Sequence, residues 1–263
     1  MSITFDNVTK RFGDTEAVSA VSFEIPSRTT AVLLGSSGCG KTTLMRMVNR
    51  MVDPTSGRVL IDDLNVADKD PVELRRSIGY VMQSGGLMPH WTVADNIATV
   101  DRLQGADKAT ARARAAELLE IVGLDAAMAS RYPAELSGGQ RQRVGVARAL
   151  APDPNILLMD EPFGAVDPIQ RRLLQDELLR IQRELNKTIL FVTHDVDEAL
   201  MLGDEVIVLR PGARIAQRGT PAQLVDKPAD DFVAGFIGSR GNLRLDGSVV
   251  YDDSGRVVGK LSS

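Results

Sequence analysis

The sequence predicts an α/β fold organised around a buried parallel sheet, and three apolar runs support this prediction. The runs Thr29–Leu34, Asn155–Met159 and Thr188–Thr193 show no regular alternation with polar residues, as expected of strands buried on both faces. The first run leads into a glycine-rich loop, and the other two end at Asp160 and His194. Because ligands bind at the carboxyl edge of such sheets, these strand ends are the expected site.

The glycine-rich loop reads GSSGCGKTT and fits the pattern G-x-x-x-x-G-K-[ST], between a strand and a helix predicted over Thr43–Met51. Glycines let the backbone wrap around phosphates, and the free N–H groups at the helix start favour an anion. Lys41 is expected to reach the β- and γ-phosphates, and Thr42 to offer its hydroxyl to Mg²⁺. We therefore predict that a nucleoside triphosphate is held by Gly35, Ser36, Ser37, Gly38, Cys39, Gly40, Lys41, Thr42 and Thr43.

Composition and charge disfavour other classes of protein. The 263 residues are 43% hydrophobic and suffice for one large domain or two small ones. With 31 basic and 35 acidic residues, the chain lacks the basic character of a protein that coats nucleic acid. Cys39 is the only cysteine, so no internal disulfide can form and a reducing compartment is expected.

Neither an export signal nor a membrane span is predicted. The first residues, Met1–Asp6, alternate like a strand and lack the layout of a signal peptide. The longest segment without Asp, Glu, Lys or Arg, Ser77–Ala94, contains glycines, a proline and several polar residues. Any membrane association is therefore expected to depend on a partner.

The N-terminal region is predicted to form an edge hairpin. Its strands are Ile3–Val8 and Ala17–Ile25, and Lys10–Asp14 is the polar turn between them. Phe12 lies in that turn, where its ring could stack on an adenine or be half-buried in the core. The local sequence alone favours the core.

Two further strands are predicted at Arg58–Ile61 and Ser77–Met82. Gln83 follows the second strand, where it could be a solvated strand end or could reach a metal ion or a water. The next segment, Ser84–Trp91, is predicted to be a loop that exposes Leu87, Met88 and Trp91. Its apolar residues are either core residues or a contact for a partner.

The pentapeptide LSGGQ at residues 136–140 precedes a predicted helix. Ser137 and Gln140 have the spacing of a capping box, which accounts for those two residues structurally. Gly138 and Gly139 disfavour a helix, and they indicate that something approaches the backbone closely there. An anion is the obvious candidate.

Two adjacent carboxylates follow the strand at 155–159. Asp160 can hold Mg²⁺ through its water shell, whereas Glu161, on the opposite side of the strand, can orient and polarise a water. His194 is at the carboxyl end of another strand, and this position favours a contact with the γ-phosphate over a purely structural role.

The remaining patterns complete the α/β arrangement. Residues 92–150 predict a mainly helical insertion without strands. The other predicted elements are helices over Lys108–Val122 and Pro168–Leu185, a hairpin of Val206–Leu209 and Ile215–Gln217, a helix that opens at Pro221, a short helix near Phe232–Ile237, and two weak strands within Asn242–Ser263. No function is suggested by this last segment.

Taken together, these motifs resemble the ATP-binding subunit of an ABC transporter, over nearly the whole chain to about Gly238. In this resemblance residues 35–43 are the Walker A loop, 156–160 the Walker B strand, and 136–140 the signature that marks this superfamily among ATPases. Further correspondences are Glu161 with the catalytic glutamate, Gln83 with the Q-loop, His194 with the switch histidine, residues 164–167 with the D-loop, and Phe12 with the aromatic that stacks on adenine.

The resemblance implies a P-loop NTPase (RecA-like) core with an antiparallel β subdomain and a helical ABC-specific subdomain. The core with its β subdomain would comprise residues 1–91 and 151–240, the helical subdomain 92–150, and a short extension 241–263. Besides the loop, ATP would contact Phe12, Gln83, Asp160, Ser137, Gly138, Gly139 and Gln140. Mg²⁺ would be held by Thr42, Gln83 and Asp160, and catalysis would involve Lys41, Gln83, Glu161 and His194.

In this family two cassettes pair head to tail, so each ATP would lie between the Walker A loop of one copy and the signature of the other. Closure and reopening of the dimer would drive integral membrane permease subunits, whose coupling helix is expected near Gln83–Trp91. A solute-binding protein would take part indirectly, and no nucleic-acid partner is expected. The subunit would lie at the cytoplasmic face of the cell membrane.

Within the superfamily, EPFGAVDP at 161–168, IGYVMQ at 78–83 and GLMPH at 86–90 are similar to importers of quaternary amines such as glycine betaine, choline and carnitine. The expected function is the ATP-hydrolysing subunit of such an importer. Alternatives are an importer of polyamines, amino acids or another small solute, or a soluble ABC ATPase acting on ribosomes or DNA. Such subunits often carry C-terminal CBS domains, for which the sequence is too short, so ionic-strength sensing through them is not expected.

Overall fold

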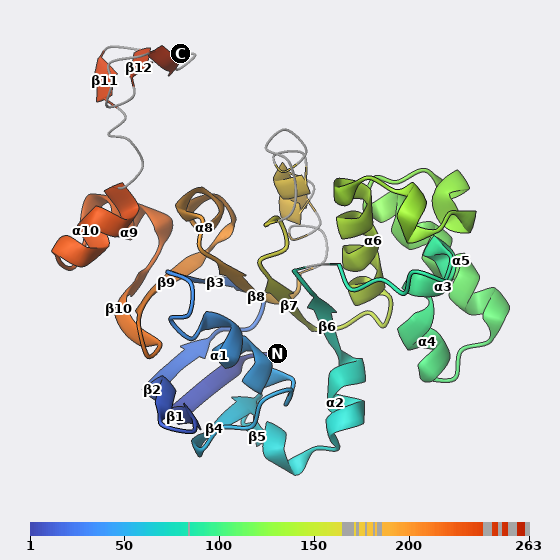
Figure 1. Cartoon of the computed structure of the whole chain (residues 1–263), viewed down its shortest axis with the longest axis horizontal. Helices are drawn as coiled ribbons and strands as arrows, with labels where there is room; N and C mark the ends of the chain where they lie inside the picture. The colour runs from blue at the N-terminus through green and yellow to red at the C-terminus, as the bar shows by residue number, and fades with distance from the viewer. Residues whose placement is uncertain are drawn as a thin grey trace.

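The computed structural model (Figure 1) describes residues 1–83, 85–164, 171, 174–176, 178–180, 182, 186–238, 244–246, 249–251 and 257–260, the last three ranges as backbone only. Its described strands form a four-stranded, a six-stranded and a three-stranded sheet. The described chain thus combines a mixed α/β core with an antiparallel sheet and a helical region, in agreement with the predicted fold class.

The six-stranded sheet carries the three apolar runs that predicted the fold. Its order is β10-β9-β3-β8-β7-β6, and all neighbours are parallel except β10, which is antiparallel to β9. The strands are β3 (Thr30–Gly35), β6 (Ile78–Val81), β7 (Ile156–Asp160), β8 (Thr188–Thr193), β9 (Glu205–Arg210) and β10 (Arg214–Gly219). Every residue of β3, β7 and β8 is buried, as continuous apolar runs require.

The antiparallel sheet has the order β2-β1-β4-β5, so the predicted N-terminal hairpin lies at its edge. Its strands are β1 (Ile3–Phe12), β2 (Thr15–Ile25), β4 (Ser56–Ile61) and β5 (Leu64–Asn65). The prediction of a five-residue turn over Lys10–Asp14 is wrong: Phe12 pairs with Thr15, so the turn contains only two residues. Gly13 has φ +56°, which lets the chain reverse within that short turn.

Helix α1 (Lys41–Val48) lies between the two sheets and contacts β2 and β4 on one side and β3, β7 and β8 on the other (Figure 1). Its buried side chains include Leu44 and Met47, which join the core cluster that also contains the stacked rings of Phe5 and Phe23. The helix begins and ends earlier than the predicted Thr43–Met51. It ends because Arg50 has φ +54°, outside the helical region.

Residues 92–150 contain helices and no strand, as the sequence predicts. The elements are α3 (Val93–Ile97), α4 (Thr99–Leu103), α5 (Lys108–Ile121), η2 (Ala126–Ser130), η3 (Pro133–Glu135) and α6 (Gly138–Leu150). Helix α6 packs against α3 and α5 and also against β6, so it connects this helical region to the six-stranded sheet.

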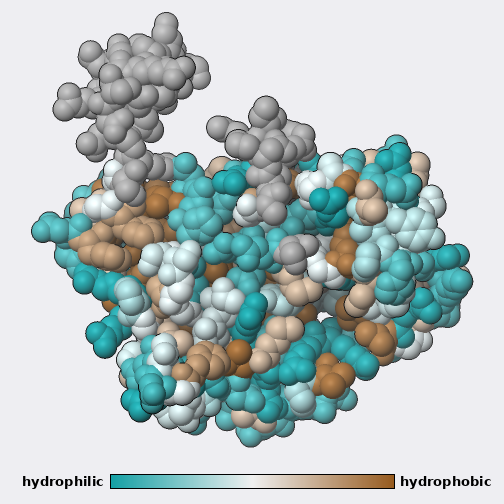
Figure 2. Space-filling model, viewed as in Figure 1, coloured by the Kyte–Doolittle hydropathy of each residue, from teal (hydrophilic) through white to brown (hydrophobic). Residues whose placement is uncertain are grey.

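The other face of the six-stranded sheet is covered by helices from the C-terminal half. They are α8 (Val196–Leu202), which packs on β3 and β8, α9 (Pro221–Asp226), which packs on β9 and β10, and α10 (Asp231–Gly238), which packs on α9. The short elements η1 (Val66–Asp68) and α2 (Pro71–Ser77) link β5 to β6. Figure 2 shows apolar side chains gathered over α9 and α10 on an otherwise mixed surface.

The C-terminal segment forms the three-stranded sheet, with β11 (Arg244–Asp246), β12 (Val249–Tyr251) and β13 (Val257–Lys260). The prediction of two strands in this segment is wrong, because β11 is also present. Its sequence, Arg-Leu-Asp, is too short and too polar to show a strand pattern. The predicted helix over Pro168–Leu185 falls largely outside the described residues, although several of its described residues are helical.

Candidate nucleotide site

Strand register places the predicted site residues at one edge of the six-stranded sheet. β3 is parallel to β8 with Leu34 opposite Thr193, and β8 is parallel to β7 with Val192 opposite Asp160. The three strands therefore end at the same level, and the segments that follow them begin side by side. As the sequence predicts, this edge brings together Asp160, His194 and the glycine-rich loop of residues 35–43, which we call the phosphate loop.

The backbone of the phosphate loop is enclosed so closely that two of its glycines have no room for a side chain. A Cβ at Gly40, which has φ +110°, would lie 2.5 Å from the carbonyl oxygen of Ala17. A Cβ at Gly35 would lie 2.7 Å from the carbonyl oxygen of Leu209. The strands on either side thus fix the path of the loop, and this explains why glycine is needed at both positions.

The start of α1 leaves backbone donors available for an anion. Gly40 is the N-cap, it offers no side-chain cap, and the first turn contains no acidic residue. The first N–H groups of a helix have no partner within the helix and carry partial positive charge. The loop therefore presents these groups in the manner expected of a phosphate site.

Lys41 is buried, and its ammonium group folds back over the loop. The Nζ atom donates hydrogen bonds to the carbonyl oxygens of Gly35, at 2.6 Å, and Ser36, at 2.9 Å. Only 4% of the residue is exposed, and among the described residues the ammonium makes no ion pair. The partners of this buried cation, two carbonyl oxygens and the Cys39 sulfur, are uncharged, so no ion pair cancels its attraction for an anion that enters the loop.

Thr42 and Asp160 form the polar pair at the start of α1 and the end of β7. The Thr42 hydroxyl donates to Asp160 Oδ1 at 2.8 Å. The other oxygen, Oδ2, accepts a hydrogen bond from the Tyr80 hydroxyl at 3.4 Å and lies 3.6 Å from a guanidinium nitrogen of Arg46. Burial raises the pKa of Tyr80, which therefore stays a neutral donor toward this carboxylate.

Gln83, Glu161 and His194 are far apart in the sequence and meet at one carboxylate oxygen. Gln83 Nε2 donates to Glu161 Oε2 at 3.2 Å, and His194 Nδ1 lies 3.2 Å from the same oxygen. The Glu161 side chain is only 17% exposed, whereas that of His194 is 56% exposed. An oriented carboxylate is thus placed beside the phosphate loop with a solvent-facing imidazole next to it.

The backbone of Glu161 is in the left-handed region, with φ +44°. This conformation is uncommon for a residue with a side chain and costs free energy. Two hydrogen bonds hold it: Glu161 N donates to the carbonyl oxygen of Val192 at 2.9 Å, and Gly164 N donates to that of Glu161 at 3.1 Å. The turn directs the side chain toward Gln83 and His194 instead of along the strand.

The signature residues form the predicted capping box at the start of α6. Gln140 N donates to Ser137 Oγ at 3.2 Å, and Ser137 N donates to Gln140 Oε1 at 2.9 Å. Ser137 is exposed, while Gly138 and Gly139 begin the helix. Among the described residues, no hydrogen bond or ion pair links this segment to the phosphate loop, and Figure 1 shows α6 apart from α1. Within the described part of one chain, the signature at 136–140 and the phosphate loop are therefore not in contact through these bonds.

Phe12 is 52% exposed, so the local preference for a core position is wrong. It ends β1 beside a two-residue turn, where its ring projects from the edge hairpin and has the Lys10 ammonium 5.0 Å from its centroid. An exposed ring is free to stack on a planar group.

The predicted D-loop, residues 164–167, cannot be located fully, because residues 165–167 lie outside the described residues.

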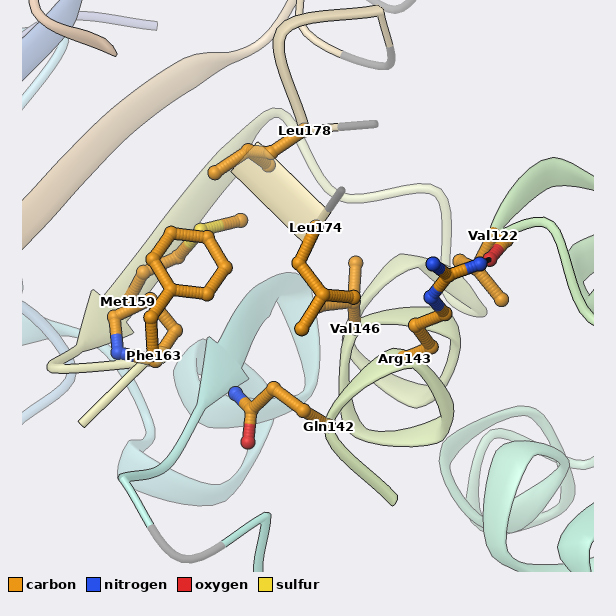
Figure 3. Close-up of a pocket in the computed structure, with 9 residues that line it drawn as sticks. Val122, Gln142, Arg143, Val146, Met159, Phe163, Leu174 and Leu178 are labelled. Carbon is orange, nitrogen blue, oxygen red and sulfur yellow. Dashed lines mark hydrogen bonds between the residues drawn. The ribbon is translucent and has the colours of Figure 1, made fainter. Parts of the chain in front are cut away.

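The pocket drawn in Figure 3 is distinct from the phosphate loop. It lies between α6 and the end of β7 and is lined mainly by apolar side chains, among them Val146, Met159, Phe163 and Leu174. Gln142 also lines it, and its buried Nε2 has no hydrogen-bond partner among the described residues. Without a cluster of donors for phosphates, this pocket is unsuited to a nucleotide.

Sequence reasoning missed several residues that support the site. Tyr80 lies within a strand that was predicted, and its hydroxyl reaches Asp160. Glu198 is buried in α8, four residues after His194, and bonds to Thr193. The sequence pattern predicts no helix directly after His194, so the apolar neighbours of Glu198, Ala199 and Leu200, were the only available signal, because carboxylates are rarely buried without a partner.

Known proteins resemble the chain over both the fold and the site. The ABC transporter family model matches residues 18–164, a range that includes the phosphate loop, LSGGQ and Glu161. The chain is 50% identical over 248 residues to the osmoprotectant import ATP-binding protein OsmV of Salmonella typhimurium, covering 92% of this chain and 65% of OsmV. It is 47% identical over 236 residues to the glycine betaine uptake system ATP-binding protein YehX of Escherichia coli, covering 90% of this chain and 76% of YehX.

A solved structure supports the same relationship. The chain aligns with a dimeric structure of the ATP-binding cassette MJ0796 bound to ADP and Pi, with 33% identity and a TM-score of 0.75, over 83% of this chain and 98% of that one. The fold is that of the ABC ATPase cassettes. The chain belongs to the ABC transporter family, as an ATP-binding domain.

The chain spans between 59% and 65% of the length of OsmV and of two other curated relatives. No helix among the described residues has the length and apolar character needed to cross a membrane.

Proposed function

We propose that this chain hydrolyses ATP, with Mg²⁺, to energise an ABC importer of quaternary-amine osmoprotectants. One observation carries the catalytic part of this proposal: Gln83, Glu161 and His194 meet at the sheet edge that also carries the phosphate loop. A binding module without activity has no need for a carboxylate held in an unfavourable backbone conformation and oriented by two neighbours. The family and the relatives support the ATP-binding part.

The residues present fit Mg²⁺ bound together with a triphosphate. Thr42 and Asp160 provide a hydroxyl and a carboxylate already in contact, which are hard oxygen ligands of the kind Mg²⁺ prefers. No group of three or more His, Cys, Asp and Glu side chains suited to a metal exists in the described part of the chain. An ion here would therefore depend on the phosphate oxygens, with Gln83 at the other side of the site, and it would supply positive charge beside the β- and γ-phosphates.

Binding of the triphosphate is attributed to the loop. Backbone N–H groups of residues 36–43 would donate to the phosphates, and the Lys41 ammonium would exchange its two carbonyl partners for β- and γ-phosphate oxygens. The exposed ring of Phe12 would stack on the adenine. These contacts fix the γ-phosphate at the edge where Glu161 lies.

Hydrolysis is attributed to the three converging side chains. Glu161 Oε2 would accept a proton from the attacking water, and the Gln83 amide would keep this oxygen oriented. His194 lies beside the same oxygen and would hold the γ-phosphate while charge moves onto the leaving group. General base catalysis of this kind contributes about 10²- to 10⁴-fold to the rate.

The site is proposed to be completed by a second copy of the chain. The signature at 137–140 exposes a serine and an N-terminal helix turn, but nothing in the described chain links it to the loop of the same copy. In a head-to-tail pair, each signature would face the γ-phosphate held by the other copy. The dimeric arrangement of the similar cassette MJ0796 supports this proposal.

The contact with the permease is proposed to involve the loop that ends at Trp91. Met88 is exposed, whereas Leu87 packs partly against the core, so the predicted exposure of Leu87 is only partly correct. Asn96 is fully buried and holds the loop: its Oδ1 accepts from Met88 N at 2.7 Å, and its Nδ2 donates to the carbonyl oxygens of Met88 and Trp91. A loop held at Met88 and Trp91, a few residues after Gln83 in the sequence, is suited to transmit a partner's movement to the site.

The solute class is inferred from the relatives and from the resemblance of residues 78–83, 86–90 and 161–168 to importers of quaternary amines. OsmV and YehX are described as osmoprotectant and glycine betaine import proteins, respectively. We propose that this chain serves an importer of the same class, at the cytoplasmic face of the membrane, through permease subunits and a solute-binding protein. Polyamine or amino-acid importers use the same cassette design and are the competing assignment.

The catalytic proposal is tested by Glu161→Gln. This variant keeps the shape and the hydrogen bond to Gln83 but removes the base, so we expect steady-state ATP hydrolysis to fall at least about 100-fold while ATP affinity remains within about twofold. The matched control is Glu120→Gln, an exposed position on α5, which should leave both quantities unchanged. Full turnover by Glu161→Gln would refute the assignment of the base.

The transport proposal needs a separate test. A tagged chain, expressed in its native cells, should recover an integral membrane protein, and deletion of its gene should lower the uptake of radiolabelled glycine betaine, choline or carnitine. Recovery of ribosomes or DNA instead would favour the soluble ATPase. If the deletion instead lowers polyamine or amino-acid uptake, the chain serves an importer of that class.

A further inference from the structure

Outside the phosphate site, a cluster of polar side chains surrounds the backbone of His194. We call this cluster the histidine clamp; its members are Arg171, Gln175, Thr193, Asp195 and Glu198. Three of them are deeply buried, with 1%, 4% and 7% of Thr193, Glu198 and Gln175 exposed. Buried polar groups of this kind require a structural or functional reason.

Glu198 holds the residue on the N-terminal side of His194. The Thr193 hydroxyl donates to Glu198 Oε2 at 2.6 Å, and the same Thr193 oxygen accepts a hydrogen bond from Asp195 N at 3.0 Å. The Thr193 side chain therefore spans His194 and links the end of β8 to the start of α8. With its carboxylate partner in place, the hydroxyl has one fixed orientation.

Asp195 holds the residue on the C-terminal side. It is the N-cap of α8, where its Oδ1 accepts from the N–H groups of Asp197, at 2.8 Å, and Glu198, at 3.3 Å. Its other oxygen, Oδ2, lies 3.3 Å from Arg171, and this guanidinium also approaches Glu198 Oε1 at 4.0 Å. Thr193 is thus held by Glu198 and Asp195 by Arg171, and Glu198 and Arg171 lie 4.0 Å apart.

The clamp also joins His194 to the helical segment that follows the D-loop in the sequence. Gln175 Nε2 donates to Glu198 Oε1 at 3.4 Å, and Arg171 belongs to the same segment. Burial raises the pKa of Glu198, while Thr193 and Arg171 oppose that shift, so the carboxyl group is costly to bury and depends on these partners. An apolar residue would fill the space without this cost, but it could not link the two segments.

We propose that Glu198 is a positioning residue for hydrolysis: through Thr193 and Arg171 it fixes the backbone of His194, and it joins this histidine to the helical segment of Arg171 and Gln175. This inference rests on the proposed function, because it concerns the reaction in which His194 takes part. Among the described residues no hydrogen bond or ion pair joins Glu198 to Glu161, so its role is exerted through other residues. Its effect is to keep the imidazole 3.2 Å from Glu161 Oε2.

The test compares Glu198→Ala with Glu198→Gln and Thr193→Val. Because a misplacement of about 1 Å in a reacting group costs on the order of 100-fold, we expect Glu198→Ala and Thr193→Val to lower kcat by about 10- to 100-fold with the KM for ATP unchanged. Glu198→Gln keeps an acceptor for the Thr193 hydroxyl and should restore kcat to within about threefold of the wild type. Glu120→Ala, on the exposed side of α5, is the matched control.

Imidazole NMR supplies a readout that general loss of structure would not produce. The chain has only two histidines, and His90 lies in the loop that precedes α3, outside the clamp, so its signal is an internal reference. In the Ala and Val variants the His194 signal should shift and broaden while that of His90 stays in place. Glu198→Gln should return the His194 signal toward its wild-type position.

Two results would overturn the inference: unchanged kcat in Glu198→Ala, or a fall in kcat with an unshifted His194 signal. The proposed function would fail on a different measurement, the activity of the wild type. A wild-type protein that binds ATP without hydrolysing it would contradict the catalytic proposal, whatever the variants of Glu198 and Thr193 show. Thr193→Val keeps the branched shape of the side chain and leaves Glu198 its contacts with Gln175 and Arg171, so it preserves the test if Glu198→Ala does not fold.

Discussion

At the scale of single residues, Gly40 is the position where the phosphate loop tolerates least change. We predict that Gly40→Ala lowers the free energy of unfolding by about 2 to 4 kcal/mol, because the new Cβ combines an unfavourable φ with a contact 2.5 Å from the carbonyl oxygen of Ala17. Urea unfolding followed by circular dichroism measures the change.

Gly105→Ala separates these two effects. Gly105 has φ +98°, close to that of Gly40, but a Cβ there meets nothing within 4 Å, so only the backbone strain remains and a loss of about 1 kcal/mol is expected. Equal losses in the two variants would show that the enclosure of the loop contributes nothing to its requirement for glycine.

Residue spacing was enough to predict the parts of the site that are local in sequence. The phosphate loop is one continuous segment, and Asp160 follows a run whose burial was evident, so both could be located without a structure. The left-handed backbone of Glu161 and the Tyr80 hydroxyl beside Asp160 depend on contacts with β8 and α1, which no local pattern encodes. Glu198 escaped notice for the same reason, because its partners come from separate segments.

At the scale of elements, the loop before α3 depends on a single buried amide. We predict that Asn96→Ala destabilises the protein by about 2 to 3 kcal/mol, because the backbone groups of Met88 and Trp91 lose their partner inside the fold. Amide hydrogen exchange at residues 86–91 should become faster, while exchange in β7 changes only through the loss of overall stability.

The control for this prediction is Asn65→Ala. Asn65 is the N-cap of η1 and accepts a hydrogen bond from Ala67 N at 3.1 Å in an exposed position, so its loss should cost about 1 kcal/mol or less. Similar effects of the two substitutions on exchange in the loop would contradict the role given to Asn96.

Element boundaries show where sequence patterns stop being informative. The buried strands were predicted to within a residue or two, because continuous apolar runs leave little choice of position. Helix α1 was misplaced by two residues at its start and three at its end, since its limits depend on the backbone of Gly40 and Arg50 and not on apolar spacing. The two-residue turn after Phe12 was hidden because the last residues of β1 before it, Lys10 and Arg11, are polar and not buried, and therefore read as part of a turn.

At the scale of the whole molecule, the proposed function places two separate halves of a nucleotide site on each chain. The phosphate loop is at the edge of the six-stranded sheet, and the signature begins α6 in the helical region, with no bond between them among the described residues (Figure 1). ATP can then act as the link between two copies. We predict that Glu161→Gln, which binds ATP without consuming it, becomes a stable dimer when ATP is added, measured by size-exclusion chromatography with light scattering.

A substitution in the signature tests whether that dimer forms through the proposed contact. Ser137→Asp, added to Glu161→Gln, preserves the cap of α6 because aspartate is as good an N-cap as serine, but it places a negative charge where the other copy's γ-phosphate is expected. The double variant should still bind ATP, with an affinity lowered only by the lost contribution of dimerisation, and remain a monomer. If it dimerises as readily as Glu161→Gln, the two copies meet through another surface, and the signature must serve a purpose within its own chain.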